Sequence, residues 1–226
     1  MKIIDPSFEI LTPFGPLTEQ VGVQMLQFIE RMARISHRSE DRQTATSYSK
    51  FIEAVVLGHG DWSVVEHASL TVIFRVDRGV THELVRHRLF SFTQESTRFV
   101  NYGKQTDLEF IQPARIEEGG HVYSNIPTWE RAIAVSEQAY LELLRNGVRP
   151  QEARSVLPNA LAATIAVTGN LRSWRWFFLA RTTKETHPDF LRVSIPLLET
   201  FKKFIPLLYD DVEPLQKQSI SMAKAR

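Results

Sequence analysis

The sequence contains no cysteine. Disulfide bonds, thiolate metal sites and cysteine nucleophiles are therefore excluded. It also lacks any uninterrupted run of about 18 apolar residues, the length that a membrane-spanning helix requires. Residues 1–6 already include charges and a proline, where a signal peptide would build its apolar segment. We therefore expect a soluble cytoplasmic protein that has no membrane partner.

The chain also has little net charge. Its 27 basic and 26 acidic residues give a formal net charge of +1. Such a balance provides no long-range field that would attract bulk nucleic acid or anionic lipid. We expect no nucleic-acid partner, and any recognition of anions must come from local groups of side chains.

Several nucleotide and metal motifs are missing as well. Gly58 and Gly60 form a lone Gly-x-Gly, and neither a Walker loop nor a Rossmann fingerprint occurs. His82 and His87 lie five residues apart, about 140° around a helix, whereas a zinc-protease helix brings its two histidines onto one face. His59, Asp61, Glu66 and His67 show no metal-ligand spacing, so we expect no metal site.

The length of 226 residues and the 43% apolar content suit one domain with a full core. Apolar spacing and turn residues predict helices around a modest sheet, an α+β arrangement. One apolar stretch, 161–168, is left open between helix and strand. Helices are expected at 19–37, 44–57, 79–87, 128–145 with Thr128 as N-cap, from Pro150 to near Pro158, at 171–181, and at 188–208 with an interruption at Pro196. Strands are expected at 68–76 and 109–112, and a frayed tail after Pro214.

Residues 86–98 carry the densest polar chemistry of the chain. Three guanidiniums, an imidazole and several hydroxyl and amide groups are packed into this stretch, from Arg86 to Arg98. Folding alone needs few of these groups in one place, whereas a phosphorylated, planar ligand needs forked cations for phosphate and hydroxyls or amides for its polar edges. We therefore predict that this segment binds a ligand.

Other interpretations of the same residues remain open at this point. Arg86, Arg88 and Arg98 are alternatively solvated charges in weak surface ion pairs. Arg154 and Arg181 lie beside apolar neighbours, so each requires a structural carboxylate or a bound anion or base. Serines 91 and 96 lack a nucleophile elbow, which favours phosphate binding. The aromatic residues Trp174, Trp176, Phe177 and Phe178 are typical of core or interface packing, with ring stacking on a flavin or base as the alternative.

The chain resembles the flavin-dependent thymidylate synthases. The signature of that family, Arg-His-Arg followed by two residues, Ser, four residues, Ser, one residue and Arg, is complete here. Further similarity covers roughly residues 35–198. The signature residues are Arg86, His87, Arg88, Ser91, Ser96 and Arg98, and the further motifs are His59-Gly60, Glu66-His67, Ala153-Arg154 with Val156-Leu157-Pro158, and Asn170-Leu171-Arg172 with Trp174, Phe177, Phe178 and Arg181.

The resemblance implies methylation of dUMP at C5. Methylenetetrahydrofolate would be the carbon donor and FAD, reduced by NADPH, the hydride donor. The missing cysteine agrees, because the other class of thymidylate synthase attacks the ring with a thiolate, whereas flavin chemistry needs no protein nucleophile. The resemblance also implies one domain over residues 1–226 with a central, mostly antiparallel sheet flanked by helices, and a homotetramer whose active sites are shared between subunits.

The resemblance assigns roles by position. Arg181 would be catalytic, because it would hydrogen-bond the pyrimidine carbonyl and N3 edge and stabilise the negative charge that activates the ring. Arg172 lies nine residues away on the same helix and so would face the opposite side. The nucleotide-binding set would be Glu83, Leu84, Val85, Arg86, Gln94, Glu95, Ser96, Thr97, Arg98, Arg154 and Arg181. The flavin-binding set would be Ser63, Glu66, Arg86, His87, Arg88, Gln94, Asn170, Arg172 and Trp176.

The sequence departs from the family pattern at a few positions. Thr93 stands where many members have Asn, Gln94 and Glu95 replace other pairs, Asp61 stands where some have His, and Trp176 stands where Asn or His is usual. These departures concern the details of flavin contact. Two alternatives stay open: the same chemistry on UMP in a nucleoside-antibiotic pathway, and a non-catalytic module that binds RNA or a free nucleotide.

Overall fold

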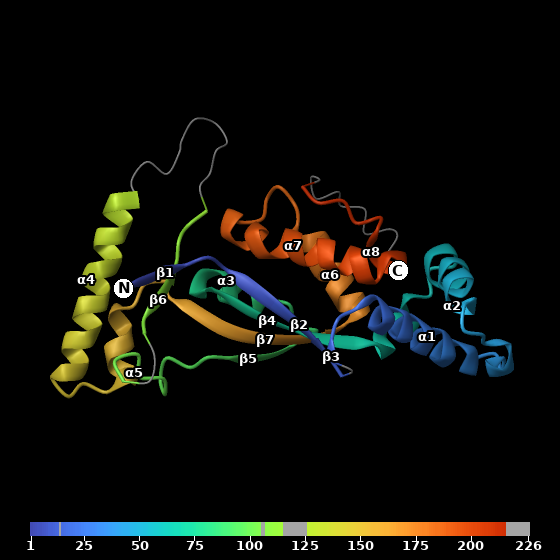
Figure 1. The fold of residues 1–226 in the computed structure, drawn as a ribbon, viewed down its shortest axis with the longest axis horizontal. Coiled ribbons are helices and arrows are strands. Elements are labelled where there is room, and N and C mark those ends of the chain that lie inside the picture. Colours follow the sequence, from blue (N-terminus) through green and yellow to red (C-terminus); the bar gives the residue numbers. More distant parts are fainter. Residues whose placement is uncertain (14, 105–106, 115–125, 216–226) are drawn as a thin grey trace. The chain divides into compact units, whose positions relative to one another are not determined.

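The computed structural model describes residues 1–13, 15–104, 107–114 and 126–215, and it has the expected α+β architecture (Figure 1). The strands are β1 Lys2–Ile4, β2 Ser7–Thr12, β3 Gly15–Pro16, β4 Ser69–Asp77, β5 Ser91–Gln94, β6 Glu109–Ile111 and β7 Ala162–Asn170. The helices are α1 Glu19–Ile35, α2 Ser47–Phe51, α3 Arg78–Leu84, α4 Ile126–Arg145, α5 Pro150–Ala153, α6 Leu171–Arg181, α7 Pro188–Phe204 and α8 Pro206–Tyr209. A π-helical segment, Ile52–Gly58, continues α2, and short 3-10 helices cover Glu40–Arg42, Trp62–His67 and Arg154–Val156.

Five strands form the main sheet in the order β3-β2-β4-β7-β5. In the central pair, the hydroxyls of Thr71 and Thr168 lie 2.7 Å apart, and Arg75 donates to Thr164 Oγ1 at 2.9 Å. Residue numbers rise along β4 as they fall along β7, so these two strands are antiparallel. The sheet is mostly antiparallel, as expected, and a separate parallel pair joins β1 to β6. The stretch whose identity the sequence left open is strand β7.

The chain divides into two compact units, which we describe separately. The first unit comprises the described residues of 1–8, 73–86 and 92–166, and the second unit comprises those of 9–72, 87–91 and from 167 onward. Strands β2, β4, β5 and β7 each contribute residues to both units. Whether the chain behaves as one domain therefore stays a prediction.

The first unit has an apolar core around α4, which lies beside α5 (Figure 1). Tyr140 of α4 is fully buried, and its ring lies 6.1 Å from that of Tyr102. This unit buries its own apolar cluster, which consists of Tyr102, Leu108, Phe110, Ile133, Tyr140, Ala153 and Leu161.

The second unit has a core of aromatic rings from α6, α7 and α8, three helices that contact one another in sequence. Trp174, Phe177 and Phe178 are fully buried, and the ring of Phe178 lies 4.9 Å from that of Phe201. The packing role expected of these three residues is confirmed, because edge-to-face contacts add to the gain from burial. Trp176 on the same helix is 46% exposed, so it takes no part in this core.

Three details of the sequence-based expectation are wrong or untested. Helix α4 begins at Ile126 and not at a Thr128 N-cap, since Pro127 is tolerated in a first helical turn. Helix α7 continues through Pro196, because its buried face, which includes Leu197 and Phe201, offsets the lost backbone hydrogen bond. The expected frayed tail lies outside the described residues from 216 onward. Strands β1, β2 and β3 were not anticipated.

None of the helices in the described part of the chain is long and apolar enough to cross a membrane.

Helices α1 and α7 of the second unit approach closely at Gly22, which lies on the buried face of α1. A Cβ atom placed there would lie 2.0 Å from the backbone oxygen of Phe204. That oxygen is not the end of a flexible side chain, so the helices would have to separate. Glycine is therefore needed here for space and not for an unusual backbone angle.

We predict that Gly22→Ala destabilises the protein by about 1–3 kcal/mol, the usual cost of overpacking a core. Helix propensity alone predicts the opposite sign, a gain of about 1 kcal/mol. Urea unfolding followed by circular dichroism measures the difference. Gln24→Ala, an exposed position on the same helix, is the control and should change stability by less than about 0.5 kcal/mol. A stabilised Gly22→Ala variant would refute the close approach.

Candidate functional site

The residues predicted to bind ligands fall into both units. The second unit holds Ser63, Glu66, His87, Arg88, Asn170, Arg172, Trp176 and Arg181. The first unit holds Glu83, Leu84, Val85, Arg86, Gln94, Glu95, Ser96, Thr97, Arg98 and Arg154.

In the second unit, the junction between β7 and α6 sets the positions of both helix arginines. Asn170 is the N-cap of α6, and its Oδ1 accepts a hydrogen bond from the backbone N–H of Ser173 at 2.8 Å. An Asn at this position satisfies an N–H group that the helix leaves unpaired. The capped start places Arg172 in the first turn of α6 and Arg181 at its last residue. The side-chain amide oxygen of Asn170 thus has a structural role.

Arg172 pairs with Glu66 on the 3-10 helix Trp62–His67. Its Nη1 lies 2.6 Å from Glu66 Oε1, and both side chains are more than a third exposed. An exposed pair of this kind contributes little to stability, so both groups remain available to a ligand at low cost. Ser63 lies on the same 3-10 helix and is also exposed. This group has the charges and hydroxyl that a dinucleotide phosphate or a polar ring edge requires.

Arg181 is held by His87. The Nε of Arg181 donates a hydrogen bond to Nε2 of His87 at 2.9 Å, across 94 residues of sequence. The guanidinium also lies over the ring of Phe190, 5.4 Å from its centroid. An arginine fork fixed at Nε presents its two terminal nitrogens in a defined plane. The contact joins the Arg-His-Arg signature to the end of α6 within one unit.

The surroundings of His87 keep its imidazole neutral. Its ring packs on Phe177 at 5.1 Å and edge-on to Phe90 at 6.0 Å. Burial, and to a smaller degree the positive charge of Arg181, lowers the pKa of His87 to about 4. At neutral pH the imidazole is therefore uncharged, and its Nε2 can accept the hydrogen bond that Arg181 Nε–H donates.

The fit of a flavin can be judged from the chemistry of the exposed groups. In the second unit, Arg88 is exposed and Trp176 offers a 46% exposed indole ring. Arg86, in the first unit, is also exposed. Guanidiniums suit the pyrophosphate of FAD, and an exposed indole suits stacking on a flat heterocycle. The side chains present thus fit the cofactor that the sequence implies.

In the first unit, the end of α3 gives its predicted residues different environments. Leu84 is buried, with 1% of its surface exposed, so its side chain belongs to the core, whereas Val85 is 42% exposed. Glu83 is half-buried. The side-chain amide of Gln94 on β5 donates to the Thr81 hydroxyl at 3.1 Å, which ties β5 to α3. These contacts fix the frame that precedes the Gln94–Arg98 loop.

Glu95 has both carboxylate oxygens engaged inside the first unit. Its Oε2 lies 2.7 Å from Arg75 Nη1 and accepts from the backbone N–H of Thr164 at 3.2 Å. Its Oε1 accepts from the Tyr102 hydroxyl at 2.7 Å. Burial and the Glu95 carboxylate raise the pKa of Tyr102, so the hydroxyl stays protonated and donates. Glu95 therefore anchors the loop to β4 and β7.

The remaining residues of the loop form a tight turn. The backbone carbonyl of Ser96 accepts from the N–H groups of Phe99 and Val100, and its hydroxyl accepts from the Arg98 N–H at 3.3 Å. Arg98 is exposed and lies over the Phe99 ring, 5.4 Å from its centroid. Such a turn presents Arg98 and the Ser96 region on the surface, where a phosphate can reach them.

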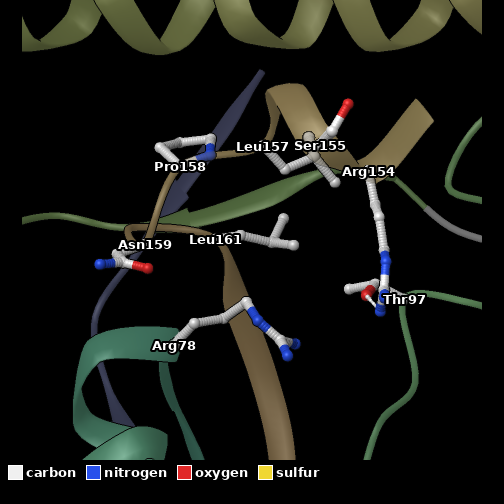
Figure 2. Close-up of a pocket in the computed structure, with 8 residues that line it drawn as sticks. All are labelled: Arg78, Thr97, Arg154, Ser155, Leu157, Pro158, Asn159 and Leu161. Carbon is white, nitrogen blue, oxygen red and sulfur yellow. Dashed lines mark hydrogen bonds between the residues drawn. The ribbon is translucent and has the colours of Figure 1, made fainter. Parts of the chain in front are cut away.

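Arg154 reaches the same loop from the 3-10 helix that follows α5. Its Nη1 donates to Thr97 Oγ1 at 3.1 Å. The two side chains line a cavity of about 240 Å³ in the first unit, drawn in Figure 2, together with Arg78, Ser155, Leu157, Pro158, Asn159 and Leu161. The sequence left two alternatives for Arg154, a structural carboxylate or a bound anion or base. The structure shows instead a hydrogen bond to a hydroxyl group, and the side chain borders the cavity.

Three residues of this region were missed by the sequence analysis. Arg75 and Tyr102 hold Glu95, and Arg78 lines the cavity. Arg75 falls on the polar side of an alternating strand, where an outward charge is ordinary, and Tyr102 has no distinguishing pattern. Arg78 could have been identified from the sequence by its position directly after a predicted strand, at the start of a helix.

The fold is shared with solved structures, one of which serves as an example. The UMP/dUMP methylase PolB from Streptomyces cacaoi, bound with 5-Br dUMP, matches with a TM-score of 0.70 over 93% of this chain and 96% of that chain, at 21% sequence identity. At that identity the match establishes the shared fold alone.

The family and its members give the stronger comparison. The sequence model of the thymidylate synthase complementing proteins matches residues 23–207. A flavin-dependent thymidylate synthase from Corynebacterium efficiens is 34% identical over 215 residues, covering 87% of this chain and 82% of the relative. Another from Mycobacteroides abscessus is 33% identical over 208 residues, covering 85% and 80%. The chain therefore belongs to the thymidylate synthase complementing protein family, the flavin-dependent thymidylate synthases.

Proposed function

We propose that this protein converts dUMP to dTMP by reductive methylation at C5, with methylenetetrahydrofolate as carbon donor and NADPH as reductant. Family membership supports an enzyme that uses a flavin over the non-catalytic binding module. The observation that carries the proposal is the hydrogen bond of 2.9 Å from Arg181 to His87. It joins the family signature to the arginine assigned to the pyrimidine.

In the proposed mechanism, Arg181 polarises the pyrimidine. Its guanidinium is oriented through Nε by the neutral imidazole of His87, so its terminal nitrogens can fork onto the carbonyl and N3 edge. A fixed positive charge at that edge stabilises negative charge as it develops in the ring and thereby raises electron density at C5.

Bound FAD, once reduced, would supply the hydride that completes the methyl group. We assign its binding to Ser63, Glu66, Arg86, His87, Arg88, Gln94, Asn170, Arg172 and Trp176. The exposed Arg172–Glu66 pair supports this assignment, because its charges can be redirected to a ligand. Asn170 contributes through the start of α6 that it caps.

We assign the nucleotide to the loop Gln94–Arg98, to residues 83–86, and to Arg154 and Arg181. Ser96, Thr97, Arg98 and Arg154 offer hydroxyls and guanidiniums for the phosphate. Glu95 acts through its anchoring of the loop, since its carboxylate is hydrogen-bonded to Arg75 and Tyr102.

We further propose that the active enzyme is a single-domain protomer in a homotetramer with shared active sites. Two large apolar side chains next to signature residues support an interface: Leu89 in the second unit is 78% exposed and Phe99 in the first unit is 76% exposed. Apolar groups this exposed are typical of surfaces that a partner covers.

The proposed function is tested by tritium release from C5-labelled dUMP. We expect the purified, flavin-loaded enzyme to release tritium from dUMP in the presence of NADPH and methylenetetrahydrofolate, with UMP as the competing substrate. Arg181→Ala should lower turnover at least about 100-fold, the usual effect of removing one transition-state donor, while flavin absorbance is retained.

Arg31→Ala, an exposed arginine of the same unit, is the matched control and should keep full turnover. If tritium is released faster from UMP than from dUMP, UMP and not dUMP is the substrate. Unchanged turnover in Arg181→Ala would remove that residue from ring activation.

His87 should make stability dependent on pH. Its pKa in the folded state is about 4, below the ordinary 6.5, so the unfolded chain binds more protons between these values. The folded state therefore loses stability as pH falls from about 6.5 to 4. We expect the Tm of the wild type to fall more over this range than that of His87→Gln, whose side chain does not titrate. Parallel Tm curves for the two proteins would contradict a half-buried imidazole that is neutral in the folded state.

Loss of the Glu95 carboxylate should weaken both the fold and nucleotide binding. For Glu95→Gln we expect about 1–3 kcal/mol lower stability in urea unfolding, because Arg75 loses a charged partner, and a higher KM for dUMP with a smaller change in kcat. Tyr102→Phe should shift both in the same direction by less. Glu152→Gln, an exposed position in the same unit, is the control. A Glu95→Gln variant with wild-type KM would show that the loop does not need this anchor.

A further inference from the structure

Helix α6 ends at the arginine on which the proposed mechanism depends. Arg181 is the last residue of α6, and the carbonyl groups of a final helical turn have no partner within the helix. Helix ends fray for this reason, and a side chain on the last residue moves with the backbone that carries it. A guanidinium that must meet the edge of a ring therefore needs a fixed backbone as well as a fixed side chain.

A buried serine of α7 provides a partner for this helix end. The hydroxyl of Ser194 donates a hydrogen bond of 2.6 Å to the backbone carbonyl of Arg181, across 13 residues of sequence. Ser194 is fully buried, and α6 and α7 pack against each other within the second unit (Figure 1). The hydrogen bond therefore joins the two helices at the point where α6 ends.

Helix packing alone does not explain a serine at position 194. A serine inside a helix usually points to solvent or donates to the carbonyl four residues earlier, whereas Ser194 donates to another helix. The other buried residues of α7 are all apolar: Phe190, Val193, Leu197, Leu198 and Phe201. A buried hydroxyl is costly in such surroundings unless it has a hydrogen-bond partner. Its partner here is the carbonyl of the arginine assigned to the pyrimidine.

The same face of α7 also contacts the guanidinium of Arg181. Phe190 lies one helical turn before Ser194, so the two side chains are neighbours on one face of α7. The Phe190 ring lies 5.4 Å from the guanidinium carbon of Arg181. This ring is fully buried and packs on that of Phe177 at 5.7 Å. Helix α7 thus contacts Arg181 both at its backbone carbonyl and at its charged group.

The connection between the two helices adds further hydrogen bonds at the end of α6. Thr182, Thr183 and Thr186 in this connection are all buried. The Thr182 hydroxyl donates to the carbonyl of Phe178 at 2.8 Å, and the hydroxyls of Thr183 and Thr186 lie 3.3 Å apart. The last turn of α6 is therefore hydrogen-bonded both to the segment that follows it and to α7.

We propose that Ser194 is a positioning residue for Arg181: its hydroxyl fixes the last residue of α6, and this keeps the guanidinium directed at the pyrimidine edge. The inference rests on the proposed function, which assigns Arg181 to ring activation, and adds a residue that acts through Arg181. A donor that stabilises developing charge is effective only when it is held in place before the reaction. The effect of removing the Ser194 hydroxyl must therefore depend on the presence of Arg181.

The first measurement is the rate of tritium release from C5-labelled dUMP by the flavin-loaded enzyme. We expect Ser194→Ala to lower kcat about tenfold, less than the loss in Arg181→Ala, because the guanidinium is present but less well positioned. The KM for dUMP should change less than kcat, and flavin absorbance should be retained. Ser194→Cys, which keeps the size of the side chain and a weak donor, should recover part of kcat.

A double-mutant cycle separates positioning from a general loss of structure. If Ser194 acts through Arg181, Ser194→Ala should cause no further loss of kcat in the Arg181→Ala background. Thr200→Ala is the matched control, since Thr200 lies on the same helix and its hydroxyl donates to a carbonyl of that helix, Pro196, at 2.9 Å. This variant should leave kcat unchanged in both backgrounds.

Hydrogen exchange at the end of α6, followed by mass spectrometry, gives a measurement that does not require the reaction. The N–H of Thr182 donates to the Phe178 carbonyl at 3.0 Å and should be protected in the wild type. We expect the peptide that contains Thr182 to exchange faster in Ser194→Ala than in the wild type or in Thr200→Ala. Should Ser194→Ala fail to fold, Ser194→Cys is compared with the wild type, and the same changes are expected at smaller size.

The outcomes separate the inference from the proposed function. Wild-type kcat in Ser194→Ala overturns the inference, and so does an equal loss of kcat with and without Arg181, because the effect would then not depend on the arginine. Unchanged exchange at the end of α6 also overturns it. If the wild type releases no tritium from dUMP, the proposed reaction fails, and faster exchange in Ser194→Ala still supports the role of Ser194 in fixing Arg181.

Discussion

The antiparallel pairing of β4 with β7 is the constraint on which the rest of the structure depends. Each strand ends where a functional element begins: β4 leads into α3 and the Arg-His-Arg signature, and β7 leads into α6 with its two arginines. Two side-chain hydrogen bonds connect the strands at different positions along their length, Thr71 with Thr168 and Arg75 with Thr164. A shift of one residue between these strands would turn each side chain to the opposite face. Register in the sheet therefore controls the positions of the Arg-His-Arg signature and of the two arginines on α6.

Some charged side chains of the first unit form structural ion pairs, and others are placed to bind a ligand. Arg75 bridges Glu95 and Glu109, and hydrogen bonds from Lys2 and from Arg75 lower the pKa of Glu109, so its carboxylate is charged at neutral pH. Arg98 is exposed, and Arg154 binds a hydroxyl at the edge of the cavity. Both carboxylates thus pair with Arg75. The positive charges of Arg98 and Arg154 are therefore available to attract an anionic ligand.

Local patterns predicted much of the fold. The helices at 19–35 and 171–181 and the strand at 69–77 follow directly from apolar periodicity, and the family signature identified the family. The strands β1–β3 are short, and their pairing with distant segments cannot be read from local sequence. Pro196 gave a false signal because burial of one face of α7 outweighed the local cost of proline. For the site, sequence gave the residue types, but partners such as Tyr102 for Glu95 arise from contacts that only the fold creates.

Helix α6 has a mechanical consequence for how the enzyme can evolve. Arg172 and Arg181 stand on one continuous helix, and nine residues at about 1.5 Å each separate them by roughly 13.5 Å along its axis. Inserting or deleting a single residue between them would rotate one arginine by about 100° relative to the other. The length of α6 between these two residues therefore sets both their separation and their relative direction, and a substitution that conserves this length leaves both unchanged.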